Sequence, residues 1–70
     1  MNYKKTYVPM NVEQYEILRD GRTTTAIAKR AGIPYSILYG MITRRGYKIM
    51  SIYRENLAKY FGVPVTTLFQ

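Results

Sequence analysis

The stretch that decides the fold is TTTAIAKRAGIPYSILYGMITRR, residues 23–45. Its apolar residues recur at spacings of three and four on both sides of Gly32, which is typical of two short amphipathic helices joined by a tight turn. Gly32 permits the positive φ that such a turn needs. The side chains expected to face the core are Ile27, Ala28, Ala31, Leu38, Met41 and Ile42. This pattern predicts a helix, a glycine turn and a second helix packed against the first.

The outer face of the second predicted helix, near residues 34–44, carries aromatic and hydroxyl side chains. Four of them lie away from the predicted core: Tyr35, Ser36, Tyr39 and Thr43. A helix-turn-helix protein places its second helix in the major groove of DNA. Tyrosine rings can meet thymine methyl groups there, and hydroxyls can bond to bases or phosphates. We therefore expect a recognition helix, with tyrosines half-buried against their own protein as the alternative.

Charge is distributed unevenly along the 70 residues, whose formal net charge is +7. The four acids are Glu13, Glu16, Asp20 and Glu55. The segment between Gly21 and Arg54 therefore carries cations alone: Arg22, Lys29, Arg30, Arg44, Arg45, Lys48 and Arg54. Such a segment repels itself unless an anionic partner offsets the charge. We expect DNA phosphates to be that partner, with chance clustering in a basic protein as the alternative.

Composition excludes several classes of function. The chain has no cysteine and no histidine, which removes disulfides, thiolate and imidazole metal sites, and the most common general base. With four acids and no phosphate-cradling glycine loop, we expect no enzyme, no metal and no cofactor. No apolar run approaches the ~20 residues that span a bilayer. We expect a cytoplasmic protein with no membrane partner and no small-molecule ligand.

The rest of the chain predicts an all-α domain of about five short helices over residues 11–70, preceded by a flexible arm over residues 1–10. Asn11 is the expected cap of a first helix, with Gln14 completing a capping box. Val12, Tyr15 and Leu18 form its inward stripe, which Ile17 widens. A further helix has the inward stripe Met50, Tyr53, Leu57, Ala58 and Phe61, and a last helical turn follows Pro64.

Two segments resemble the phage repressor and Cro family of helix-turn-helix proteins. They are IAKRAGIPYSIL at residues 27–38 and LAKYFGV at residues 57–63, with Leu68 and Phe69 after them. The resemblance covers roughly residues 11–69. It implies a lambda-repressor-like bundle of five short helices that binds a palindromic operator in double-stranded DNA as a homodimer and regulates transcription. A chain of this length resembles either a small Cro-like regulator or the DNA-binding domain of a longer repressor.

The resemblance also implies which residues meet DNA. The base-contacting positions of the family fall on Thr24, Tyr35, Ser36, Ile37, Tyr39 and Thr43. The cations on and around the two helices are expected to contact phosphate: Lys29, Arg30, Arg44, Arg45 and Lys48. Arg54 departs from the family pattern because it stands near a position that is usually apolar. The apolar residues Leu68 and Phe69 are the candidate dimer contact.

Two other functions suit the same sequence. An antirepressor or protein-interaction module could use the face of Tyr35 and Tyr39 to bind another protein, because aromatic faces without acids also suit interfaces. A DNA-bending recombination directionality factor could use the same positive charge. Such factors often add a β-hairpin wing, and the sequence after residue 45 shows no pair of alternating strands joined by a turn.

Overall fold

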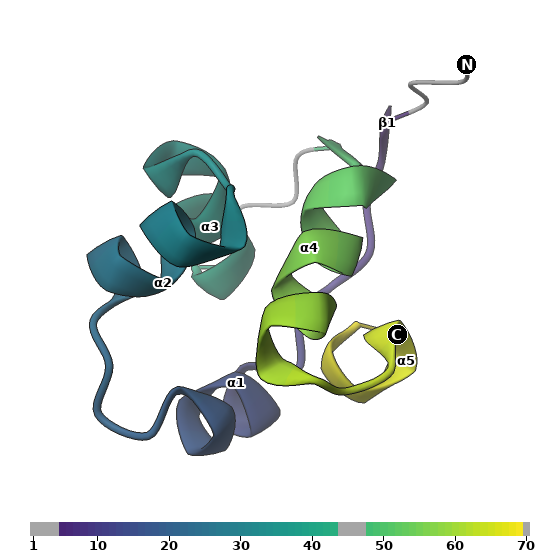
Figure 1. Ribbon diagram of the computed structural model, residues 1–70. Helices are drawn as coiled ribbons and strands as arrows, with labels where there is room; N and C mark the ends of the chain where they lie inside the picture. Colours follow the sequence, from purple (N-terminus) through teal and green to yellow (C-terminus); the bar gives the residue numbers. More distant parts are fainter. Residues whose placement is uncertain (1–4, 44–47, 70) are drawn as a thin grey trace.

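The helical periodicity of the sequence is realised as five helices in the computed structural model, which describes residues 5–43 and 48–69 (Figure 1). Two short strands accompany them in the described part of the chain. In chain order the elements are β1 (Lys5–Thr6), α1 (Val12–Arg19), α2 (Thr24–Ala31), α3 (Tyr35–Ile42), β2 (Ile49–Met50), α4 (Ser51–Phe61) and α5 (Val65–Leu68). The prediction of a mostly helical small domain is confirmed.

Asn11 caps α1 as predicted, but its backbone amide bonds to Leu68 and not to the Gln14 side chain that would complete a capping box. The side chain of Asn11 accepts a hydrogen bond from the Gln14 backbone amide at 3.3 Å. The backbone amide of Asn11 donates to the Leu68 carbonyl at 2.6 Å. The cap of the first helix is therefore tied to the end of the last one.

The segment from α2 to α3 forms as its local sequence predicts. Thr23 caps α2 by accepting from the Ala26 amide at 3.1 Å. Gly32 ends the helix in the left-handed conformation, with φ of 72°. Pro34 then precedes the first residue of α3, a position where the amide proton that proline lacks is not needed. The two helices are thus separated by only three residues, so their relative placement is set within one short turn.

Residues 5–10 differ from the predicted flexible arm. Thr6 pairs with Ile49 and Lys5 with Met50 in a two-stranded antiparallel sheet. Met10 is 3% exposed and forms a β-bridge with Phe69. The small sheet joins the beginning of the chain to the segment before α4, so this part of the N-terminus belongs to the domain.

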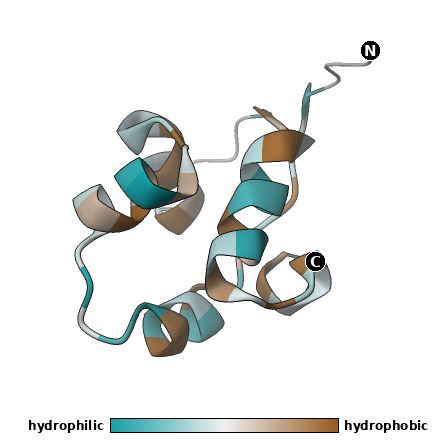
Figure 2. Cartoon of the chain, viewed as in Figure 1, coloured by the Kyte–Doolittle hydropathy of each residue, from teal (hydrophilic) through white to brown (hydrophobic). Residues whose placement is uncertain are grey.

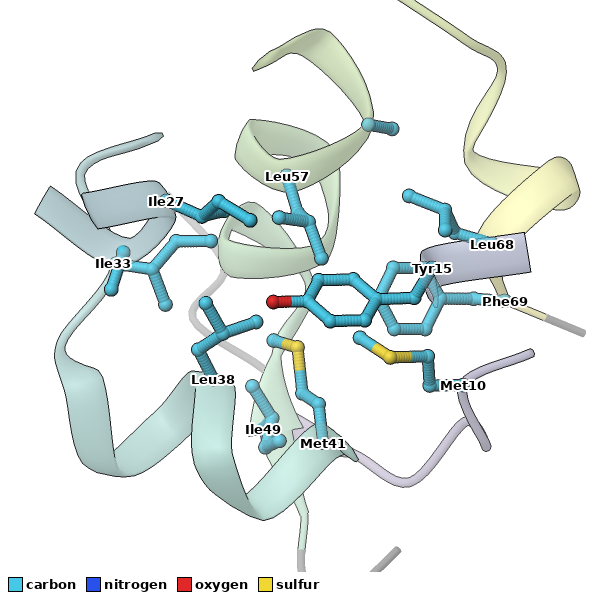
Figure 3. Packing of buried hydrophobic residues seen from close by; sticks show 12 residues of the cluster. Met10, Tyr15, Ile27, Ile33, Leu38, Met41, Ile49, Leu57, Leu68 and Phe69 are labelled. Atoms are coloured by element: carbon cyan, nitrogen blue, oxygen red, sulfur yellow. The ribbon is translucent and has the colours of Figure 1, made fainter. Parts of the chain in front are cut away.

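The core gathers apolar side chains from every helix around Tyr15 (Figure 3). Tyr15 lies across the middle of the cluster, with its hydroxyl toward Leu38 and Ile27, and its residue is fully buried. Leu68 and Phe69 are also in this core, at 0% and 3% exposure. The prediction that these two residues form a dimer contact is wrong, because the protein's own core already covers them.

Ile17 is a second correction to the predicted core. It was expected to widen the inward stripe of α1, yet 68% of its surface is exposed. Tyr15, two positions earlier, fills the core at this point of the helix and packs edge-to-face on Phe61 at 6.0 Å between ring centroids. The buried stripe of α1 is therefore narrower than predicted, and Ile17 lies outside it.

Arg54 is a cation with a structural role inside the domain. It is only 6% exposed. Its guanidinium donates to the carbonyls of Thr6 and Ile49, both at 3.2 Å, and to the Thr6 hydroxyl. Burial lowers the pKa of Arg54 below its ordinary value, because desolvation disfavours the charged form. Arg54 thus holds both strands against α4.

Candidate nucleic-acid interface

The outer face of α3 is formed mainly by two tyrosines one helical turn apart. Tyr35 is 50% exposed and Tyr39 is 43% exposed. Their rings stack with centroids 5.9 Å apart and planes 21° apart. Residues at i and i+4 share one side of a helix, so the two rings make a continuous aromatic surface on α3.

The two hydroxyl residues predicted on this face are also exposed. Ser36 lies in the first turn of α3, and Thr43 directly follows its last turn. The Thr43 hydroxyl donates to the Tyr39 carbonyl at 2.9 Å. The Tyr39 carbonyl also accepts from the Thr43 backbone amide at 3.0 Å, so the side-chain bond is a second one to the same oxygen and uses the hydroxyl proton of Thr43.

Two other predicted base-contacting residues are engaged inside the protein. Ile37 is half-buried and packs against the core. Thr24 is half-buried, and its hydroxyl lies 3.3 Å from the hydroxyl of Tyr15 in a hydrogen bond. The structure therefore places Tyr35, Ser36 and Tyr39 together on the exposed surface of α3. Thr24 and Ile37 are only half-exposed.

The structure describes three of the five cations predicted to contact phosphate. Lys29, on α2, and Lys48, before β2, are both exposed. Arg30 is exposed too, but it lines an open depression of 320 Å³ between α2 and α4. Arg44 and Arg45 lie outside the described residues.

Two cations of the acid-free segment stabilise the protein itself. Arg54 is buried against the strands. Arg22 donates to the carbonyls of Arg19 and Leu18 at 2.8 and 2.7 Å, where α1 ends. It also donates to the Tyr60 hydroxyl at 2.9 Å and lies over the Tyr60 ring. Both guanidiniums keep their charge, but their hydrogen-bond donors are engaged within the protein.

The depression beside Arg30 has lining residues that sequence reasoning missed. Asn56, Lys59 and Tyr60 come from the second half of α4 and face the end of α2. Nothing in the local pattern distinguishes them from solvated helix residues. Only the packing of α2 against α4 brings these polar side chains together, so no signal in the sequence could have found them.

Comparison with known proteins gives no relative: no family model, no curated protein and no solved structure matches the chain. Across residues 5–43 and 48–69, no three side chains of the metal-binding types His, Cys, Asp and Glu come together. Within the same described residues, every helix is too short or too polar to cross a membrane. The exposed surface of α3 is therefore the feature on which a function can be argued.

Proposed function

We propose that the chain is a sequence-specific DNA-binding regulator of transcription, with α2, the Gly32 turn and α3 acting as a helix-turn-helix. In this proposal α3 lies in the major groove and presents Tyr35, Ser36 and Tyr39 to base edges. Lys29 and Lys48 bind the phosphate backbone. Two copies occupy the half-sites of a palindromic operator, about 34 Å apart.

The observation that supports this function best is the composition of the α3 surface. Two large aromatic rings are exposed on one helix, although tyrosine side chains usually bury much of their area. The surrounding sequence from Gly21 to Arg54 contains no acid. A phosphate backbone can approach such a surface without repulsion, and single-sign charge of this kind raises the association rate with anions.

The decisive experiment is selection of binding sites from a random DNA pool with the full chain. A palindrome whose half-sites are one helical turn apart is expected. A bent site of relaxed sequence would indicate a directionality factor instead. If no sequence is enriched above the starting pool, the proposed function is wrong.

The salt dependence of binding gives a second test. Arg22 and Arg54 are bonded internally, so five cations of the segment remain for phosphates: Lys29, Arg30, Arg44, Arg45 and Lys48. Each phosphate contact contributes about −0.9 to the slope of log affinity against log salt. We expect this segment to give a slope no steeper than about −4.5 per chain. A slope near zero would point to a protein partner.

A protein-interaction module is the second candidate, and the stacked tyrosine pair is the observation that favours it. Tyrosine is enriched in protein interfaces because it buries a large rigid area and keeps a polar hydroxyl. Under this function Tyr35→Ala would abolish capture of the protein partner at any salt concentration. The DNA pool would then show no enrichment, which separates the two candidates.

A further inference from the structure

We infer that the α3 surface reads thymine methyl groups, so that the operator half-site is specified by A·T pairs. This inference rests on the proposed function and specifies which bases that function selects. Three observations support it: the side chains that α3 lacks, the hydroxyls already bonded within the protein, and the shape of the tyrosine pair.

The first observation is that α3 lacks the side chains that form paired hydrogen bonds with bases. Guanine is usually read by arginine or lysine, adenine by asparagine or glutamine, and cytosine by an acid. The ten residues from Pro34 to Thr43 include none of these six types. Figure 2 shows α3 in pale and brown shades, in contrast to the deep teal of the second half of α2. Base recognition by this helix must therefore rely on apolar contact and single hydroxyl bonds.

The second observation is that two of the hydroxyls near the α3 surface are engaged in internal bonds. The proton of the Thr43 hydroxyl goes to the Tyr39 carbonyl, and the Thr24 hydroxyl is paired with Tyr15. Each could contribute at most part of one bond to a base. The methyl group of a threonine, in contrast, remains able to touch a thymine methyl. Because these two hydroxyls are engaged, contacts of this surface with a base depend more on apolar groups than on hydrogen bonds.

The third observation is the geometry of the tyrosine pair. The rings of Tyr35 and Tyr39 are nearly parallel, with centroids 5.9 Å apart. Successive bases on one strand are about 3.4 Å apart, so the pair spans roughly two base steps. The C5 methyl of thymine is the apolar group that the major groove presents. Two such methyls within two steps of each other would fit against the exposed rings.

The test replaces thymines of the selected operator by deoxyuridine, one position at a time. This change removes the methyl and keeps every hydrogen-bonding group of the base. We expect a loss of roughly fourfold in affinity for each contacted methyl, the ratio expected for burial of one methylene-sized group. Replacing purines by their 7-deaza forms removes the N7 acceptor instead and should change affinity less than twofold.

Variants of the protein connect the loss to the tyrosine pair. In Tyr39→Ala the uracil substitution should cost less than it costs the unaltered chain, because the ring that meets the methyl is gone. Ile17→Ala is the matched control, since Ile17 is exposed on α1, away from α3, and should leave the uracil penalty unchanged. Each variant must keep the melting transition of the unaltered chain.

The outcomes separate the inference from the function on which it rests. A uracil penalty that disappears in Tyr39→Ala supports the inference. An operator that is bound selectively but tolerates uracil at every position overturns the inference and leaves the proposed function standing. A random pool that returns no preferred sequence overturns both, because then no base is read at all.

Discussion

Two regions of the molecule are held together by different kinds of contact. The region of α2 and α3 depends on residues close in the sequence: Thr23 caps α2, Gly32 makes the turn and Pro34 precedes α3. The region of β1, β2, α4 and α5 depends on distant residues. Arg54 bonds to Thr6, 48 positions away. The first region is therefore specified locally, whereas the second forms only when the whole chain folds.

The same contrast governs what each region does with its polar side chains. In the second region the charge of Arg54 is bound to carbonyls and a hydroxyl of the strands. In the first region Lys29 and the rings of Tyr35 and Tyr39 are exposed. The buried charge of Arg54 and the exposed side chains of Lys29, Tyr35 and Tyr39 thus lie in different regions. Substitutions should therefore affect either stability or binding, and seldom both.

The largest expected effect is the loss of stability in Arg54→Met. This change leaves the Thr6 and Ile49 carbonyls without their donor, and hydrogen bonds to a charged group contribute roughly 1.5–3 kcal/mol each. We expect the free energy of unfolding to fall by about 3 kcal/mol, which lowers the melting temperature of a domain this size by about 15 °C. Thermal unfolding followed by circular dichroism measures it.

Arg30→Met is the matched control for that experiment, because it removes the same side chain from an exposed position on α2. Exposed substitutions of this kind usually change stability by less than about 0.5 kcal/mol. Equal melting temperatures for the two variants would show that Arg54 does not hold the strands. The second region would then not depend on the contact between Arg54 and the distant Thr6.

An intermediate effect is expected from substitutions in the region of α2 and α3. Tyr39→Ala should weaken operator binding by roughly tenfold, within the ~1–3 kcal/mol of a good base contact, and leave binding to random DNA nearly unchanged. Lys29→Ala should weaken both DNAs about equally and flatten the salt slope by roughly one unit, because a phosphate contact carries no sequence information. Titrations against operator and scrambled DNA at two salt concentrations distinguish these patterns. Equal losses on both DNAs for Tyr39→Ala would show that its ring does not read bases.

The contrast between the regions also explains how much of the fold the sequence predicts. The Asn11 cap of α1 and the Gly32 turn depend on residues within three or four positions, and both predictions are confirmed. The strands are two residues long, too short for any alternation to appear. The burial of Leu68 and Phe69 depends on contacts with the opposite end of the chain. Local patterns carry no information on such contacts.

The candidate site divides in the same way. The exposure of Tyr35 and Tyr39 follows from helical spacing, because residues four apart share one side of a helix and the buried Met41 lies on the other side. The family resemblance implies a base contact for Thr24, but its hydroxyl meets Tyr15 from α1. A hydrogen bond between helices depends on how they pack, and spacing within one helix cannot predict it. Contact of any of these residues with DNA stays a prediction.

The smallest expected effect concerns the hydrogen bond that joins α1 to the first turn of α2. Tyr15→Phe removes the hydroxyl that lies 3.3 Å from that of Thr24 and keeps the ring in the core. A typical hydrogen bond contributes about 1 kcal/mol, so we expect a loss of that order at neutral pH. Because Thr24 begins the helix that leads into α3, the same variant tests whether that contact helps to place the binding surface.

Alkaline pH gives Tyr15→Phe a second readout. Burial raises the pKa of the Tyr15 hydroxyl above its ordinary value of 10.0, and the hydrogen bond from Thr24 offsets part of that rise. The folded chain therefore keeps the Tyr15 proton at a pH where the unfolded chain loses it, so this group's stabilisation is full below pH 10.0 and declines as pH rises above it. Chemical denaturation at a series of pH values from 8 upward should show a weaker decline above about pH 10 for Tyr15→Phe than for the unaltered chain. Identical declines would mean that the Tyr15 hydroxyl titrates in the folded protein as it does in the unfolded one. In that case it would not be a buried link between α1 and α2.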